Sequence, residues 1–211
     1  EAWQKFMKVT RQVERVGRGW SNLPQALQRE MDEVRELWEQ AADQGHLFAM
    51  NNLASMYAYG QGVAQSYVKA RDWKERAAEG GLAHAQNVLG SYYHHGREGV
   101  AIDLPRARMW WEKAAAQRHA GAQFNLGCMH RDGKGGPQDI TKARELYELA
   151  AAQGYARAQY NLGLMHNEGL GGPQDFTRAR ELYELAAAQG DAKAMTNIGL
   201  LFGKGQGAEQ D

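Results

Sequence analysis

The chain has 211 residues, which is enough for one large domain or two small ones. Its 25 Lys and Arg residues balance 25 Asp and Glu residues, so it lacks the basic excess by which general binders of nucleic acid or of anionic membranes meet phosphates. Hydrophobic residues make up 43% and charged residues 24%, a composition that can bury a core, while no apolar run approaches the ~20 residues of an integral membrane segment.

Residues 1–23 precede an internal repeat and are predicted to form a capping helix. The apolar residues of this segment fall at helical spacing, namely Trp3, Phe6, Met7, Val13, Val16 and Trp20. A helix that covers the first repeat is favoured, because solenoid proteins need atypical terminal units. The interspersed basic residues leave a second interpretation open, in which the segment is amphipathic and meets a membrane surface or a partner.

Residues 24–211 contain a repeat with a period of about 36 residues. Alanine pairs begin at positions 41, 77, 114, 150 and 186, which are spaced by 36, 37, 36 and 36 residues. Each pair is followed, in the same order, by another alanine, a leucine or isoleucine, a ring residue and a closing glycine. Self-similarity at a fixed period of this length is the signature of a repeat architecture.

Each unit is predicted to be a pair of helices. In the first unit Ala49, Leu53 and Tyr57 lie at i, i+4 and i+8, so they form one stripe of a helix. Ala70 and Ala77 belong to a stripe on a second helix. Glycines after the first helices allow the left-handed conformation that ends a helix. The residue before each second helix is expected to cap its free amide groups, and these residues are Ser66, Asp103, Asp139, Asp175 and Asp211.

A single helix pair cannot bury its own apolar face, so the units must stack. The sequence therefore predicts an all-α fold, a right-handed α/α superhelical solenoid of helix-pair repeats of about 36 residues each. The predicted units lie near residues 46–80, 82–118, 119–154 and 155–190, with a partial unit at 191–211.

The segment from Ala158 to Gly190, which reads AQYNLGLMHNEGLGGPQDFTRARELYELAAAQG, resembles a Sel-one-like repeat. This family is a cousin of the tetratricopeptide repeat, with a longer, glycine-rich turn inside each helical pair. The resemblance covers roughly residues 34–211. It implies an adaptor that assembles membrane or signalling complexes, or that acts in bacterial interactions with host or competitor proteins.

Motifs for catalysis are absent from the sequence, which has no Gly-x-Ser-x-Gly elbow and no His-Glu-x-x-His pattern. Cys128 and His130 lie about 200° apart on one predicted helix, so they do not form a nucleophile pair. The single cysteine also excludes an internal disulfide framework, so cysteine usage does not indicate whether the cellular compartment of the protein is reducing or oxidising. Some cysteine-rich relatives resemble β-lactam-binding hydrolases, but they carry repeated cysteine pairs that this chain lacks. We predict no catalytic residue and no cofactor.

The histidines favour packing over a metal site. His94, His95, His130 and His166 fall near the ends of first helices in adjacent units, where stacking would bring imidazoles together. However, His130 and His166 replace the ring residue that packs between helices, and no cysteine or carboxylate completes an evident ligand set. The sequence therefore predicts no metal site.

A partner-binding surface is predicted on the concave face formed by the first helices. In the related tetratricopeptide fold, inward positions lie one before and two, three, six, nine and ten after the repeated alanine. Residues at these positions vary from unit to unit while the packing residues stay the same, as a recognition surface requires. The candidate residues are Phe48, Asn51, Asn52, Tyr59, His84, Asn87, His95, Phe124, Asn125, Asp132, Arg157, Tyr160, Asn161, Glu168, Lys193 and Asn197.

One row of this face carries asparagine in four units, with Val88 in the remaining one; the four are Asn52, Asn125, Asn161 and Asn197. Side-chain amides both donate and accept hydrogen bonds, so such a ladder can hold the backbone of an extended peptide. The alternative is structural, since asparagines inside helices tend to bond to local backbone groups. Both interpretations stay open from the sequence.

The repeat stops abruptly, because Asp211 occupies a capping position with no helix after it. We expect that the natural chain continues or that another molecule completes the last unit. Ile198, Leu201 and Phe202 would then form an apolar surface for self-association. The leading prediction is a non-enzymatic scaffold that binds a protein or peptide on its concave face. The main alternative is an assembly module that forms homo-oligomers through its open ends, and a hydrolase is the least favoured.

Overall fold

The computed structural model describes residues 1–16, 19–97 and 99–206, and within these ranges every regular element is a helix. The chain divides into unit 1, Glu1–Ile102, and unit 2, Asp103–Asp211. Unit 1 contains α1 (Ala2–Val16), a short 3-10 helix (Trp20–Asn22), α2 (Gln25–Asp43), α3 (Leu47–Tyr59), α4 (Tyr67–Glu79) and α5 (Ala83–His95). Unit 2 contains α6 (Leu104–Ala116), α7 (Ala120–Asp132), α8 (Ile140–Ala152), α9 (Ala156–Glu168), α10 (Phe176–Ala188) and α11 (Ala192–Gly203).

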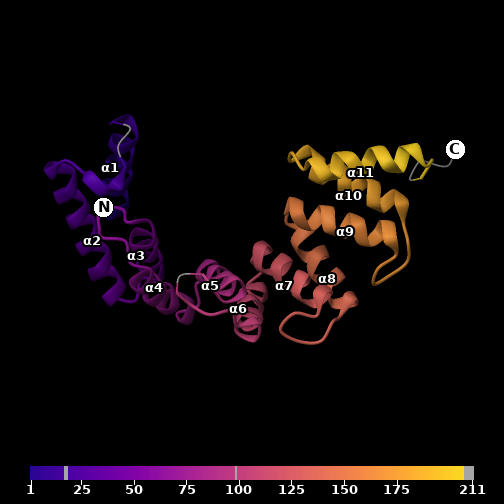
Figure 1. The fold of residues 1–211 in the computed structure, drawn as a ribbon, viewed down its shortest axis with the longest axis horizontal. Helices are drawn as coiled ribbons and strands as arrows, with labels where there is room; N and C mark the ends of the chain where they lie inside the picture. The colour runs from indigo at the N-terminus through magenta and orange to yellow at the C-terminus, as the bar shows by residue number, and fades with distance from the viewer. Residues whose placement is uncertain (17–18, 98, 207–211) are drawn as a thin grey trace. The chain divides into compact units, whose positions relative to one another are not determined.

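Within each unit, every helix packs against the next one along the chain. In Figure 1, for example, α9, α10 and α11 lie one over another in the orange and yellow part of unit 2. The first helices of the pairs are α3, α5, α7, α9 and α11, and they begin 36 or 37 residues apart. The prediction of an all-α solenoid built from helix pairs of about 36 residues is confirmed.

Polar side chains cap the second helices, as the sequence predicts. Ser66 accepts a hydrogen bond from the backbone amide three residues further on. The carboxylates of Asp103, Asp139 and Asp175 do the same at 2.9, 2.8 and 2.8 Å. Each cap satisfies an amide that the start of a helix leaves without an internal partner. These four caps are confirmed, and Asp211 lies outside the described residues.

Glycines in α7 and α9 allow an aromatic ring of the following helix to lie against the backbone. A Cβ atom on Gly127 would lie 2.7 Å from Cε1 of Tyr147, and one on Gly163 would lie 2.7 Å from Cε1 of Tyr183. Carbon atoms do not approach this closely without a shift of the structure, since their optimal separation is about 3.5–4.0 Å. Both tyrosines are buried, so the glycines let α7 meet α8, and α9 meet α10, around a large ring.

The N-terminal helix α1 lies against α2 in unit 1. Val9 and Val13 are buried, and Nζ of Lys8 forms an ion pair with Glu30 of α2 at 3.0 Å. The helix ends at Val16, before the predicted boundary at residue 23, and a 3-10 turn follows it. Helix α1 therefore covers one side of α2 at the start of unit 1.

Candidate protein-binding face

Three first helices of unit 2, α7, α9 and α11, together line a cavity of about 390 Å³, which we call the unit 2 pocket. The repeat stacks these helices as nearest neighbours of the same kind, so side chains about 36 residues apart meet. Five of the predicted partner-binding residues lie here. The lining consists of Phe124, Arg157, Tyr160, Asn161, Asp191, Ala192 and Lys193.

Aromatic side chains form the inner wall of the unit 2 pocket. Phe124 is only 3% exposed, because its ring packs against those of Tyr147 and Tyr155, with centroids 5.7 and 5.4 Å apart. Phe124 lines the pocket, but most of its ring belongs to the core, so little of it remains for contact with a partner. Tyr160 packs against Tyr183 with ring centroids 5.9 Å apart. It is only half-buried, so part of its surface remains accessible to a ligand.

Two positively charged side chains, those of Arg157 and Lys193, lie at the rim of the unit 2 pocket. The guanidinium carbon of Arg157 lies 4.6 Å from the centroid of the Phe124 ring, and Lys193 occupies the equivalent position one unit later. Both side chains are exposed. The carboxylate of Asp191 caps α11, where its Oδ1 accepts hydrogen bonds from the backbone amides of Lys193 and Ala194 at 3.0 and 3.1 Å. The pocket thus combines aromatic surface, an amide and positive charge.

In unit 1 the predicted residues of the binding face lie on α3 and α5. Phe48 and Tyr59 are the most open, with 73% and 72% of their surfaces exposed. Tyr59 lines a cavity of about 570 Å³ together with Trp20 and Gln28. The remaining predicted residues of unit 1 are His84 and His95, which are exposed, and Asn51, Asn52 and Asn87, which are half-buried.

A buried lysine lies beneath the α3 side of this face and was not predicted. Nζ of Lys74 donates a hydrogen bond to Oδ1 of Asn51 at 2.8 Å. Lys74 is only 4% exposed, and burial lowers its pKa to about 8 from the ordinary 10.5. The sequence did carry a signal, because the equivalent position in every other unit is aromatic: Trp38, Trp111, Tyr147 and Tyr183.

The predicted residues at the far ends of α7 and α9 have different surroundings. Asp132 pairs with Arg131 at 2.8 Å and with Lys134 at 3.5 Å, and the hydrogen bond from Arg131 lowers the pKa of Asp132. Its charge is therefore already compensated within the chain. Glu168 and Asn197 instead both line a separate cavity of about 150 Å³. Asn125 is half-buried on α7, and of the four asparagines in its row only Asn161 lines the unit 2 pocket.

Glutamines, rather than asparagines, form the clearest ladder of recurring hydrogen bonds in unit 2, one within each helix pair. Nε2 of Gln153 donates to Oε1 of Gln123 at 2.7 Å, and Nε2 of Gln189 donates to Oε1 of Gln159 at 2.8 Å. These bonds tie the end of each second helix to the first helix of its own pair, and Gln123 and Gln159 are buried. The 36-residue recurrence of both pairs was visible in the sequence and would have revealed this ladder.

The histidines at the ring position lie against arginines. Ring nitrogens of His130 and His166 lie 3.0 Å from Nη2 of Arg108 and Arg144, respectively. A permanent cation at this distance opposes the binding of a metal cation to either ring. Within the residues that the structure describes, no group of three or more His, Cys, Asp or Glu side chains is placed to hold a metal ion.

Cys128 is half-buried on α7. Its Sγ accepts a hydrogen bond from the hydroxyl of Tyr147 at 3.2 Å, and burial raises the pKa of the thiol. A thiol with a raised pKa is mostly protonated at neutral pH and is therefore a weak nucleophile. The surroundings of Cys128 thus favour a packing role.

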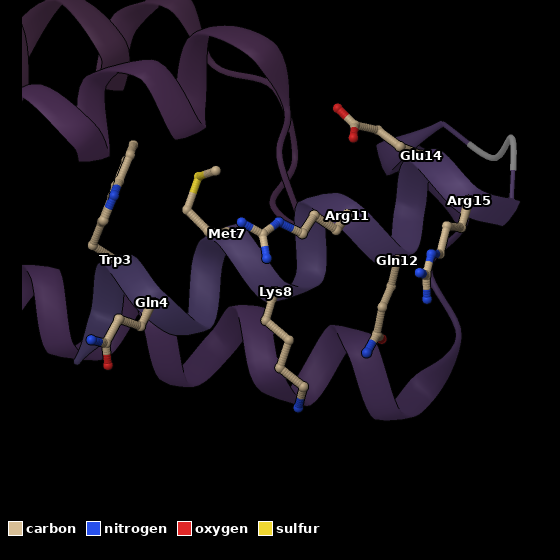
Figure 2. Close-up of a pocket in the computed structure, with 8 residues that line it drawn as sticks. All are labelled: Trp3, Gln4, Met7, Lys8, Arg11, Gln12, Glu14 and Arg15. Atoms are coloured by element: carbon tan, nitrogen blue, oxygen red, sulfur yellow. The ribbon is translucent and has the colours of Figure 1, made fainter.

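The free side of α1 forms the edge of a hollow of about 820 Å³. Figure 2 shows Trp3 and Met7 on one side of this helix and Gln4 and Lys8 on the opposite side. Trp3 is 54% exposed, while Lys8 is held by a carboxylate of α2. No helix in the described ranges is both long and apolar enough to span a bilayer. The hollow is lined by α1 alone, whereas three helices line the unit 2 pocket.

The residues predicted for self-association differ in exposure. Leu201 is 4% exposed in a cluster around Tyr183, so it is not available to a second chain, contrary to expectation. Ile198 is half-buried against the same cluster, and Phe202 is 58% exposed. Leu200 is 55% exposed and was missed, because the sequence alone does not show which side of α11 the preceding helix covers.

A family profile described as the Sel1 repeat matches residues 35–46, 47–82, 83–119, 120–155, 156–191 and 192–211. The structure of c5321, a protective antigen present in uropathogenic Escherichia coli strains and displaying an SLR fold, superposes with a TM-score of 0.80 and 35% identity, over 83% of this chain and 37% of that one. A Sel1 repeat protein from Oxalobacter formigenes superposes with a TM-score of 0.71 and 34% identity, over 79% of this chain and 67% of that one.

Curated relatives share shorter stretches. The ERAD-associated E3 ubiquitin-protein ligase component HRD3A of Arabidopsis thaliana is 33% identical over 116 residues, which are 49% of this chain and 17% of that protein. HRD3B of the same plant is 42% identical over 65 residues, which are 31% of this chain and 11% of that protein. The chain thus spans less than a fifth of these relatives. Because the matched repeats extend from residue 35 to residue 211, the chain belongs to the Sel1 repeat family, a family of protein-interaction repeats.

Proposed function

We propose that this chain is a non-enzymatic scaffold and that the unit 2 pocket binds a segment of a protein partner. The observation that carries the proposal is the pocket itself, which three first helices of the repeat line together. The residues that pack the helices recur in each unit, whereas two rows of the pocket, those of Tyr160 and of Arg157, differ between units. A constant frame with a varied lining is how repeat proteins present extended binding surfaces.

The chemistry of the lining suits a peptide. Tyr160 offers an aromatic face, and Asn161 offers donors and an acceptor to a peptide backbone. Arg157 adds a guanidinium beside these groups. Tyrosine and arginine are enriched among the residues that dominate binding energies at protein interfaces.

The curated relatives support the same class of function. The HRD3 proteins are named as components of an E3 ubiquitin-protein ligase, so similar repeats occur in a protein of a multi-component assembly. Since the similarity to HRD3A covers 49% of this chain and 17% of that protein, the identity of the partner here does not follow from it.

Peptide selection followed by hydrogen–deuterium exchange tests the proposed function. Peptides selected from a random library on the full chain should slow exchange in α9 and α11 and leave the exposed sides of α8 and α10 unchanged. Asn161→Ala should weaken the selected peptides about tenfold, which corresponds to one hydrogen-bonding side chain of ~1.4 kcal/mol. Leu185→Ala, at a half-exposed position of α10, is the matched control and should leave the affinity unchanged. Equal affinities for both variants, or protection confined to α8 and α10, would contradict the proposal.

Self-assembly is a second candidate, and exposed apolar side chains of α11 favour it. Met195 and Phe202 are 54% and 58% exposed and lie seven residues apart, on the same side of the helix, while Leu200 is 55% exposed on another side. Exposed apolar surface of this kind is typical of interaction sites. Sedimentation between about 1 and 100 μM should then show a rising mass that Leu200→Ser with Phe202→Ser abolishes. A constant mass over this range would exclude the second candidate.

A further inference from the structure

Two cations of the unit 2 pocket form no ion pair with a carboxylate of the described residues. Arg157 and Lys193 are the second residues of α9 and α11, at the same position of successive repeats. Among the described residues, no carboxylate lies within 4 Å of either head group, although Arg144 of the same unit pairs with Glu148 at 3.3 Å. Both head groups are exposed and therefore available to an acidic ligand.

The start of α9 adds to this positive charge. Helix α9 has no acidic residue in its first turn and no side-chain cap, so the positive end of its dipole faces the region of Arg157, whereas the carboxylate of Asp191 offsets the dipole of α11. The one carboxylate of the pocket, that of Asp191, is occupied by two backbone amides of α11. The pocket is therefore locally basic within a chain whose formal net charge is zero.

Stacking prepares Arg157 to bind a carboxylate. Its guanidinium lies 4.6 Å from the Phe124 ring, which Tyr147 and Tyr155 hold in place. A guanidinium that stacks through its face keeps the N–H groups of its edge free to donate, and this edge matches a carboxylate in a two-bond pairing. Less conformational freedom is then lost on binding, because the side chain is already ordered.

The aromatic wall adds a second requirement for the ligand. Tyr160 lies on α9 one turn after Arg157, so it lies on the same side of that helix. Its half-buried ring supplies apolar surface next to the two cations. A cavity of about 390 Å³ lies at the lower end of the range for small-ligand sites, and so has room for one or two side chains of a larger partner.

We propose that the unit 2 pocket selects an acidic protein segment, in which one carboxylate binds between Arg157 and Lys193 and a neighbouring apolar side chain packs on Tyr160. This inference rests on the proposed function and names the chemistry of its partner. Single-stranded nucleic acid matches the pocket less well, because a strand presents a phosphate at every nucleotide and the pocket offers two cations and one carboxylate.

Three defined peptides test the inference by fluorescence anisotropy with the full chain. The first has a central Glu-Phe-Glu sequence between Gly/Ser flanks, the second has glutamine in place of glutamate, and the third has alanine in place of phenylalanine. The first should bind about tenfold or more tightly than the second. Raising the NaCl concentration from about 50 to 500 mM should reduce the difference in affinity between the glutamate and glutamine peptides, since salt screens exposed charges.

A matched pair of double variants places the effect in the pocket. Arg157→Gln with Lys193→Gln should weaken the first peptide about tenfold or more and bring it to the affinity of the glutamine peptide. Lys142→Gln with Arg178→Gln removes the same charge from exposed positions of α8 and α10 and should leave the affinity unchanged. All four positions are exposed, so both variants should keep the circular dichroism spectrum of the wild type.

Each contrary outcome has a separate meaning. Equal binding of the glutamate and glutamine peptides, or equal losses in the two double variants, overturns the acidic partner. The proposed function still stands in that case if Asn161→Ala weakens selected peptides, and both fail if it does not. Tighter binding of a ten-nucleotide thymidine oligomer than of the glutamate peptide also overturns the inference, in favour of nucleic acid.

Discussion

Lys74 shows how one residue can depart from the repeat without changing the fold. Its ammonium lies where the other units hold an aromatic ring, and it has a single hydrogen bond, to Asn51. Among the described residues no carboxylate forms an ion pair with it. A buried charge without an opposite charge destabilises the folded state, and a well-packed apolar side chain of similar size at the same position is often more stabilising.

Lys74→Met should therefore stabilise the protein, by about 1–3 kcal/mol at pH 7. The pKa of Lys74 is lowered to about 8 in the fold, so the unfolded chain binds more protons between pH 8 and 10.5 and wild-type stability rises with pH across that window. The advantage of the methionine variant is thus largest below pH 8 and shrinks towards pH 10. Urea denaturation at pH 7 and pH 10 measures both effects.

The control for this prediction is Lys69→Met, an exposed position of the same helix. It should change the unfolding free energy by less than about 0.5 kcal/mol at either pH. A loss of stability in Lys74→Met at pH 7 would show that the bond to Asn51 outweighs the cost of burying the charge.

Arg118 is a second residue-scale departure, because it has a φ of 61° where the equivalent residues of other units are glycine. Left-handed backbone costs a side-chain residue about 1–2 kcal/mol, whereas glycine adopts it freely. Arg118→Gly should therefore raise the free energy of unfolding by about 0.5–1 kcal/mol, after the larger chain entropy of glycine is subtracted. The reverse change, Gly154→Arg at φ 81°, should lower it by a similar amount. A neutral result for Gly154→Arg in urea denaturation would contradict the strain argument.

At the scale of the element, α6 meets α7 and α8 meets α9 through an arginine against a histidine. Burial, and then the positive charge of Arg108 or Arg144, lowers the pKa of His130 and His166 from the ordinary 6.5. Nearby carboxylates, such as Asp139 and Asp175, oppose this shift but do not reverse it. The folded state therefore favours neutral rings.

Acidification should loosen these contacts. Below pH 6.5 the unfolded chain takes up protons that the folded histidines resist, so stability is complete above about pH 7 and falls as the pH drops below 6.5. The double variant His130→Phe with His166→Phe carries at both sites the phenylalanine ring that Phe202 has at the equivalent position of α11. Its stability should therefore fall less than that of the wild type as the pH drops below 6.5. Melting temperatures at pH 7.5 and 5.5 measure the difference, and an identical drop in variant and wild type would refute it.

At the scale of the whole molecule, unit 2 has a core of its own. Its buried residues form one cluster around Tyr147 and Leu162 and another around Tyr183 and Leu201. In repeat proteins most stabilising contacts join neighbouring repeats, so a run of repeats keeps its structure when others are removed. The fragment 103–211 should therefore fold alone, with a helical circular dichroism spectrum and a cooperative urea transition. A spectrum of random coil for this fragment would contradict the division into units.

The fold was largely predictable from the sequence because its determinants are local and recur. The period of the alanine pairs predicted the helix pairs. Asp139 and Asp175 predicted where second helices begin, because a capping side chain bonds only to the backbone amides next to it. The shared row of Arg157 and Lys193 followed from the same period. Repetition multiplies weak local signals, so their sum was clear without tertiary information.

Tertiary structure alone decided how these residues meet. Phe124 had the position of a surface residue but is buried, because Tyr147 and Tyr155 of its neighbours close over it. The same packing places Arg157 on that ring and leaves its charge without an acidic partner among the described residues. Periodicity assigns a residue to a side of its helix, but burial and charge pairing depend on side chains about 20 to 40 residues away, which only the folded chain brings into contact.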